Sequence, residues 1–221
     1  MGKKYLPTSV LQESRERIRM TFDEVERVYI AFSGGKDSSV MFHLVMEEAI
    51  KRGVKVGVMY IDMEAQYADT IKHTLEMFDI YKDHIDPHWI CVPMRLRNAL
   101  TNYEPQWIAW DESKKDNWVR QKPLWAKGIK DYPFIYDDMN DGIEFEEFIV
   151  MFGRWYGQGK KTAGFIGIRA QESLHRYCAI ATWEKKDLTI NGWRWTTKTI
   201  ENVYNVYPIY DWLTEDIWRF H

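Results

Sequence analysis

Short apolar runs alternate along this chain with longer stretches in which apolar residues recur every three or four positions. The short runs predict strands, at residues 28–32, 55–61, 88–92, 163–168 and 203–209. The longer stretches have helical spacing, over residues 11–25, from the turn after residue 32 to residue 52, and over 66–80, 142–157, 171–183 and 214 onward. Alternating strands and helices predict an α/β fold, with a doubly wound, mostly parallel sheet flanked by helices.

Residues 94–140 interrupt this alternation with poor periodicity and many tryptophans, among them Trp107, Trp110, Trp118 and Trp125. We expect one domain over residues 1–221 with an irregular insertion at 94–140 that contains short helices. A long irregular segment inside a compact domain is usually functional. Its aromatic residues either thicken the core or form a surface that stacks bases or docks a partner.

Composition narrows the class of protein. The 221 residues are 45% hydrophobic, enough for a large core in one α/β domain. A net charge of −3 gives no overall attraction to nucleic acid or to anionic membranes, although a local basic patch remains open. Two cysteines exclude a disulfide framework and a zinc site built on cysteine pairs. The sequence has neither a membrane-length apolar run nor a signal peptide, so we expect a cytoplasmic protein.

The most informative motif is the turn after the first strand, Ser33-Gly34-Gly35-Lys36-Asp37-Ser38. The glycines permit a positive φ and let a ligand approach the backbone. Free amides at the start of the following helix favour an anion, and the lysine and serines add donors. The aspartate would repel phosphate unless it caps the helix, pairs with the lysine or holds a metal. The turn therefore predicts a phosphate-binding loop.

Three further strands end in groups that can contact the same ligand, because the carboxyl ends of parallel strands share one edge of a sheet. Asp62 follows the second strand and either accepts from a ribose hydroxyl or adenine amino group, or caps a helix. Arg95 and Arg97 follow the third strand and are weaker candidates. Arg169 ends the fourth strand; we favour an anion contact for it over an ion pair with Glu172.

The Ser33–Ser38 turn resembles the PP-loop of the ATP pyrophosphatase and phosphoadenosine phosphosulfate (PAPS) reductase superfamily. Gly167–Ser173 (GIRAQES) is similar to the second motif of its PAPS reductase-like branch, and Tyr207–Trp212 with Glu215–Trp218 resembles the third. The resemblance implies an adenine nucleotide α-hydrolase-like fold and binding of ATP or PAPS. A Mg²⁺ ion is compatible with a bound nucleotide, because metal ions bridge phosphate oxygens. It also implies that Lys36 and Arg169 are catalytic. No carboxylate cluster marks a dedicated metal site.

Further residues resemble one subgroup, the proteins related to the immunoglobulin-binding regulator A of phages and mobile elements. The residues that carry this resemblance are 95–98, 107–110 and 114–120 and the stretch GIRAQESLHRY. That subgroup is described as co-activators with a ParB-like partner. The catalytic Glu-Cys-Gly-x-His segment of true PAPS reductases does not occur in this sequence, and we expect Cys91 and Cys178 to be small buried residues.

Three functions remain open at this point. The first is an enzyme that cleaves ATP to an AMP adduct and pyrophosphate, activating an unknown acceptor. The second is a sulfonucleotide-binding protein that lacks the reductase cysteine. The third is a nucleotide-binding regulator that acts with a ParB-like partner. All three require nucleotide binding at residues 33–38.

Overall fold

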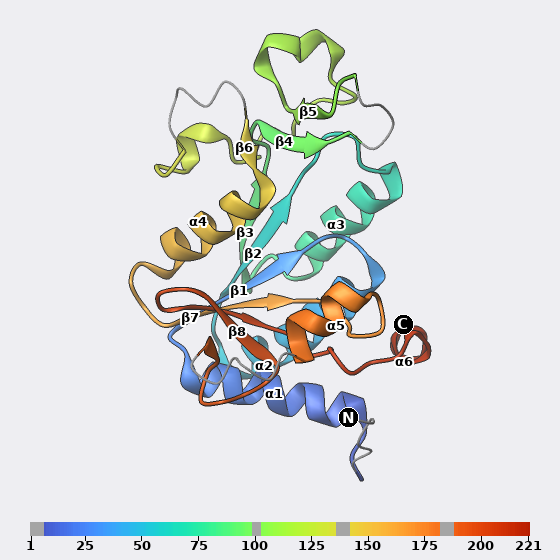
Figure 1. Cartoon of the computed structure of the whole chain (residues 1–221), viewed down its shortest axis with the longest axis vertical. Helices are drawn as coiled ribbons and strands as arrows, with labels where there is room; N and C mark the ends of the chain where they lie inside the picture. The colour runs from blue at the N-terminus through green and yellow to red at the C-terminus, as the bar shows by residue number, and fades with distance from the viewer. Residues whose placement is uncertain (1–6, 99–102, 136–141, 182–187) are drawn as a thin grey trace.

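A six-stranded sheet forms the centre of the protein in a computed structural model, which describes residues 7–98, 103–135, 142–181 and 188–221 (Figure 1). Its order is β3-β2-β1-β7-β9-β8. Neighbouring strands are parallel except β8 and β9, which pair antiparallel. The strands are β1 (Arg27–Phe32), β2 (Val56–Ile61), β3 (Ile85–Ile90), β7 (Thr162–Ile166), β8 (Thr196–Ile200) and β9 (Val203–Val206). The predicted fold class is confirmed.

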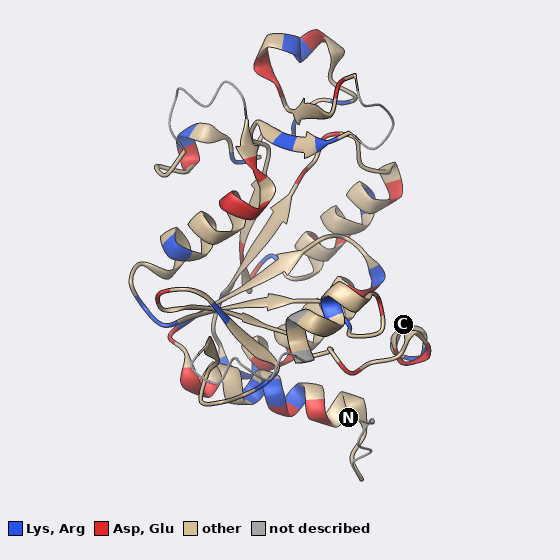
Figure 2. Cartoon of the chain, viewed as in Figure 1, with Lys and Arg blue, Asp and Glu red and all other residues tan. Residues whose placement is uncertain are grey.

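Helices cover both faces of this sheet (Figure 1). One face packs against α1 (Val10–Glu24), α2 (Lys36–Arg52) and α3 (Ala68–Ile80), and the other against α4 (Phe145–Gly157). The helices α5 (Leu174–Ala181) and α6 (Thr214–Phe220) lie near the carboxyl ends of the strands. Lys, Arg, Asp and Glu residues occur mainly in the helices and loops and are sparse in the central strands (Figure 2).

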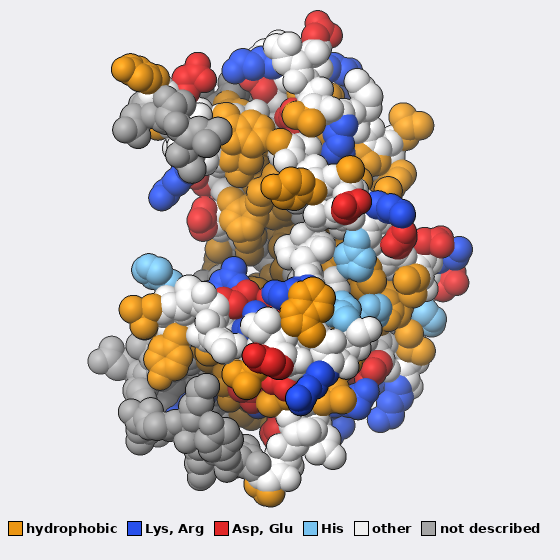
Figure 3. Space-filling model, turned by 90° about the vertical axis from the view of Figure 1, so that its right-hand side faces the viewer, with side chains coloured by type: hydrophobic (Ala, Val, Ile, Leu, Met, Phe, Trp, Pro, Cys, Tyr) orange, Lys and Arg blue, Asp and Glu red, His pale blue; other side chains and the backbone are white. Residues whose placement is uncertain are grey.

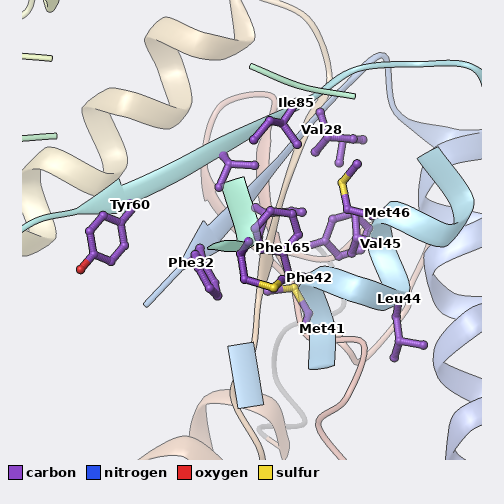
Figure 4. Packing of buried hydrophobic residues seen from close by; sticks show 14 of the residues in the cluster. Val28, Phe32, Met41, Phe42, Leu44, Val45, Met46, Tyr60, Ile85 and Phe165 are labelled. Atoms are coloured by element: carbon purple, nitrogen blue, oxygen red, sulfur yellow. The ribbon is translucent and has the colours of Figure 1, made fainter. Parts of the chain in front are cut away.

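The alternation of side chains in the central strands explains the two apolar layers. In β1, Val28, Ile30 and Phe32 face the α1–α3 layer, whereas Tyr29 faces α4. Phe32 packs edge-on against Phe42 of α2, with ring centroids 5.0 Å apart (Figure 4). A period of two thus gives each strand one apolar set for each face.

The helix after the Ser33–Ser38 turn ends where the sequence predicts. Gly53 caps α2 in the left-handed conformation with φ of 66°, which glycine adopts at little cost. Lys51 and Arg52 occupy the last turn, where positive charge is favourable beside the exposed carbonyl groups.

The insertion is more regular than predicted. The strands β4 (Met94–Arg97), β5 (Gln106–Ala109) and β6 (Ile143–Glu144) form a separate three-stranded sheet. The expected short helices are 3₁₀ helices, at Glu112–Asn117 and Ile129–Asp131. Strands of two to four residues show no readable periodicity. Residues 99–102 and 136–141 of the predicted insertion lie outside the described residues, and its status within a single domain stays a prediction.

Several element boundaries differ from the prediction. The third strand begins at Ile85 and includes Pro87, which an edge strand tolerates. The sequence Asn191-Gly192, typical of a hairpin turn, forms a turn with φ of 48° and 78°, but the β8–β9 hairpin turns at residues 201–202. The helix predicted at 171–183 is observed at Leu174–Ala181, and residues 182–183 lie outside the described part of the chain. Among the helices that the structure describes, none is both long and apolar enough to cross a membrane.

Candidate functional site

A cavity of about 500 Å³ opens at the carboxyl ends of β1, β2 and β7. Residues of the predicted loop, Ser33, Gly35, Lys36, Asp37 and Ser38, line one side. The opposite wall is apolar and comes from the ends of β2 and β7 and from α4, with Met59, Ile61, Met63, Phe145, Ile149 and Ile166. Figure 3 shows the hollow, with hydrophobic side chains above it and charged side chains along its lower rim.

Glycine at the tightest position of the loop avoids both backbone strain and crowding against α3. Gly34 has φ of 73°, and a Cβ atom there would lie 2.7 Å from Thr70 Cγ2 and 2.9 Å from Thr74 Oγ1 of α3. Gly35 is the N-cap of α2 and offers no side-chain acceptor to the first amides of the helix. These amides are oriented to bind an anion.

Hydroxyl groups hold the loop in its curved shape. Ser38 Oγ donates to the Gly35 carbonyl at 2.9 Å and lies 2.9 Å from Ser33 Oγ. Ser39 Oγ also donates to the Gly35 carbonyl, at 3.0 Å. The two predicted serines therefore preorganise the loop while lining the cavity.

Asp37 is paired with two cations. Lys36 Nζ lies 3.1 Å from Asp37 Oδ2, and Arg169 Nη2 donates to the same oxygen at 3.3 Å. Burial alone would raise the pKa of Asp37, but hydrogen bonds from Arg169 and then Lys36 outweigh it and lower this pKa. Arg169 is 4% exposed and does not line the cavity. Its guanidinium reaches the site through Asp37, so its predicted direct contact with an anion stays a prediction.

A second ion pair at the cavity, Glu172 with Arg176, was not predicted as part of the site. Both residues line the cavity, and Arg176 Nη1 donates to Glu172 Oε2. Glu172 Oε2 also accepts the backbone amide of Arg169, at 2.9 Å, which fixes the chain after β7. Arg176 lies in the stretch GIRAQESLHRY, which the sequence analysis singled out. Its position seven residues after Arg169 gave no sign that it lines the cavity.

Close packing joins the second motif to the loop. A Cβ atom on Gly167 would lie 2.7 Å from the Cα atom of Ser38 and 3.0 Å from its amide nitrogen. The end of β7 therefore touches the backbone of the first turn of α2. Glycine at this position sets how closely Ile168 and the loop approach each other at the cavity.

Asp62 points away from the cavity into a buried cluster. Its side chain is fully buried and accepts from Trp89 Nε1 at 2.7 Å and from Arg120 Nη2. The Glu64 amide donates to it at 2.9 Å. In this conformation the predicted contact with a ribose or adenine would require Asp62 to exchange these partners. Sequence reasoning could not foresee them, because Arg120 is 58 residues away.

Glu64 continues this connection between β2 and the insertion. It is 5% exposed, with φ of 63°, and accepts the amides of Trp110 at 2.7 Å and Val119 at 3.1 Å. Met63 lies between the two buried carboxylates and lines the cavity. The insertion is thereby fastened to the segment that forms part of the cavity wall.

The remaining predicted groups lie elsewhere. Arg95 pairs with Glu144 in the small sheet. The third motif packs against α1, where Arg17 donates to both carboxylate oxygens of Asp211, at 2.8 and 2.6 Å. The Ala170 amide donates to the Tyr210 carbonyl at 2.8 Å, so this motif supports the chain that follows β7.

Neither cysteine lines the cavity. Cys91 is buried as predicted, and burial followed by the nearby Asp62 raises the pKa of its thiol. Cys178 is exposed, so the prediction that it is buried is wrong. Within the described ranges, no group of three or more His, Cys, Asp or Glu side chains could hold a metal ion.

Comparisons with known proteins point to the same family that the second and third sequence motifs resemble. Residues 27–221 match the family described as the phosphoadenosine phosphosulfate reductase domain. The chain is 38% identical over 218 residues to the uncharacterized protein YbdN of Escherichia coli K12, covering 98% of this chain and 52% of that protein. It therefore spans about half the length of this curated relative.

Two solved structures are similar at low identity. Yeast FAD synthetase in complex with FAD has a TM-score of 0.46 and 14% identity, covering 100% of this chain and 61% of the other. The U34-tRNA thiolase NcsA from Methanococcus maripaludis has a TM-score of 0.46 and 15% identity, covering 99% and 65%. Neither resemblance bears on what this chain binds.

Proposed function

The chain belongs to the phosphoadenosine phosphosulfate reductase domain family, and on this premise we propose that it binds an adenine nucleotide, ATP or PAPS, in the cavity above the Ser33–Ser38 loop. The observation that carries the proposal is the contrast between the two sides of the cavity. One side presents helix amides, hydroxyls and Lys36, whereas the other is formed by Met59, Ile61 and Phe145. Such a pairing suits a ligand with a phosphate chain at one end and a flat, weakly polar ring at the other.

In this proposal the cations that line the cavity and the buried Arg169 have different roles. Lys36 is 37% exposed at its side chain and Arg176 45%, so both can turn toward phosphate without leaving water entirely. Arg169 is buried and holds Asp37, which keeps this carboxylate from repelling the ligand. A direct role for Arg169 in catalysis would require that ion pair to open.

We further propose that ATP is cleaved between its α- and β-phosphates. A nucleophilic atom of the acceptor bonds to the α-phosphorus and loses its proton, while the bond to the bridging oxygen breaks and its electron pair leaves with pyrophosphate. Lys36 and Arg176 are the groups placed to stabilise the charge that develops on the leaving oxygens. The acceptor becomes an AMP adduct.

Magnesium fits this site as a companion of the nucleotide. Among the described residues, Asp37 and Glu172 are the carboxylates that line the cavity, and both are paired with cations. A magnesium ion would therefore be held chiefly by phosphate oxygens and water, as is usual for this ion. It would supply charge neutralisation at the phosphates.

The direct test is to incubate the protein with Mg-ATP and, separately, with PAPS, and to measure binding together with release of pyrophosphate or sulfite. We expect pyrophosphate release that Lys36→Ala abolishes. Lys160→Ala is the matched control, because Lys160 is exposed in the turn before β7 and pairs with Glu26. Failure to bind either nucleotide would contradict the proposal.

The same assay distinguishes the other two functions. Sulfite release from PAPS with an added thiol would favour a sulfonucleotide reductase that takes its thiol from elsewhere, because neither cysteine lines the cavity. Binding without turnover would favour a nucleotide-binding regulator. The proposed relation to the immunoglobulin-binding regulator A-like subgroup would then direct the search to a ParB-like partner.

A further inference from the structure

A second cavity, of about 350 Å³, lies between the insertion and the end of β3. Cys91, which follows β3, is among its lining residues, and the rest come from residues 112–128. The chain at Lys127 runs beside the edge of the main sheet, with its amide donating to the Trp89 carbonyl at 2.7 Å and its carbonyl accepting from the Cys91 amide at 2.9 Å. The cavity is thus anchored to the sheet.

The side chains of this second cavity carry a net positive charge. Lys115, Lys122 and Lys127 line it, and Glu112 is the acidic residue among the lining residues. Three positive charges and one negative charge leave a balance of +2. Lys127 Nζ also lies 3.8 Å from Asp131 Oδ1, a carboxylate outside the lining residues.

Trp118 gathers two of these ammonium groups around one ring. Lys122 Nζ lies 4.4 Å from the centroid of the Trp118 ring, and Lys115 Nζ lies 5.7 Å from it. Lys122 is neutralised by Glu112 at 2.6 Å. Among the residues that the structure describes, no acidic oxygen lies within 4 Å of Lys115 Nζ. Lys115 therefore lies near a second ammonium group without a carboxylate partner of its own. Such an arrangement of like charges is unfavourable in the absence of a counter-charge.

We propose that this lysine pocket, defined by Lys115, Lys122 and Lys127 around Trp118, is a second anion site that takes a small phosphate-bearing polyanion. Lysine ammonium groups bind phosphate as point charges with three donors each. The volume exceeds that of a single phosphate and limits the occupant to a small ligand. The Gln121 amide, which also lines the pocket, adds polar contacts for its oxygens.

The buried cluster around Asp62 separates this pocket from the nucleotide cavity. Cys91 Sγ lies 3.6 Å from Asp62 Oδ2 on one side, and Met63 lines the nucleotide cavity on the other. The two sites therefore share a wall but no lining residue. Binding at the lysine pocket does not depend on the proposed nucleotide function.

The test is lysine acetylation footprinting by mass spectrometry, with inorganic pyrophosphate as the probe. We expect pyrophosphate to slow acetylation of Lys115 and Lys127 severalfold. Lys114 and Lys130 are neighbouring exposed lysines outside the pocket and should keep their rates. Repeating the experiment in Lys36→Ala removes the main phosphate site from the comparison, and protection at the lysine pocket should persist.

Substitution gives the second arm of the test. Calorimetric titration in the Lys36→Ala background should show pyrophosphate binding that Lys115→Gln with Lys127→Gln removes and that Lys114→Gln with Lys130→Gln preserves. Equal protection of all four lysines would reveal nonspecific attraction and overturn the proposal. Absence of protection at Lys115 and Lys127, or its loss with Lys36→Ala, would overturn it as well.

Discussion

At the scale of single residues, the site depends on how its charges are paired. Asp37 stands where a phosphate is expected, and it is tolerated because Lys36 and Arg169 neutralise it. Arg169 in turn is almost fully buried and needs a carboxylate. Asp37, which on its own would repel a phosphate, is therefore also the group that holds the buried Arg169 in place.

Replacing Asp37 with asparagine should destabilise the protein, because Arg169 would be left buried without a compensating charge. We expect the free energy of unfolding to fall by about 3 kcal/mol, a typical cost of breaking a buried ion pair. Chemical denaturation measures this loss, and Asp69→Asn in the exposed first turn of α3 is the control. Equal stability of Asp37→Asn and the wild type would show that the pair contributes nothing.

At the scale of elements, the insertion is fastened to the main sheet through the segment after β2. Asp62 contacts Trp89 and Arg120, and Glu64 accepts two amides of the insertion. Buried carboxylates hold irregular backbone that has no strand or helix partner of its own. This connection brings the insertion to the wall of the cavity above the Ser33–Ser38 loop.

Replacing Glu64 with alanine should loosen the insertion without disturbing the main sheet. The amides of Trp110 and Val119 would lose their acceptor, at a cost of about 2 kcal/mol for the buried amide of Trp110. Hydrogen exchange should accelerate at these two amides and remain unchanged in β1 and β2. Glu104→Ala, at an exposed position of the insertion, should have no such effect. Unchanged exchange at Trp110 would refute the role of Glu64.

The sequence predicted best those elements whose signals are local. Val28–Phe32 and the helix that ends at Gly53 were readable because a periodic core and a glycine stop are encoded within a few residues. The pairing of Asp62 with Arg120 and the register of β4 with β6 depend on contacts between distant residues. The same distinction applies to the candidate site. The Ser33–Ser38 loop could be predicted from the sequence, whereas the burial of Arg169 and the position of Arg176 at the cavity could not.

At the scale of the whole molecule, the buried His88 and the half-buried His43 make stability depend on pH. His88 lies among Phe152, Trp155 and Tyr156, and burial lowers its pKa below the ordinary value of 6.5. Burial, followed by repulsion from His221 and His73, also lowers the pKa of His43. The unfolded chain takes up protons as the pH falls through 6.5, while the folded protein resists them.

The free energy of unfolding should therefore decline as the pH falls below 6.5 and should be insensitive to these histidines above it. Replacing both His43 and His88 with glutamine should flatten this decline, although packing losses lower the stability at every pH. His175→Gln, at an exposed position of α5, should leave the slope unchanged. Denaturation curves on both sides of pH 6.5 make the comparison, and a slope that survives the double substitution would contradict it.

The most direct test of the central claim is amide hydrogen exchange across the Ser33–Ser38 loop, with and without Mg-ATP or PAPS. If the loop binds the phosphate or sulfate groups of an adenine nucleotide, the amides of Lys36, Asp37 and Ser38 will be protected by at least one of the two ligands. Lys36→Ala will weaken that protection. Unchanged exchange at these amides under saturating concentrations of both nucleotides would contradict the account.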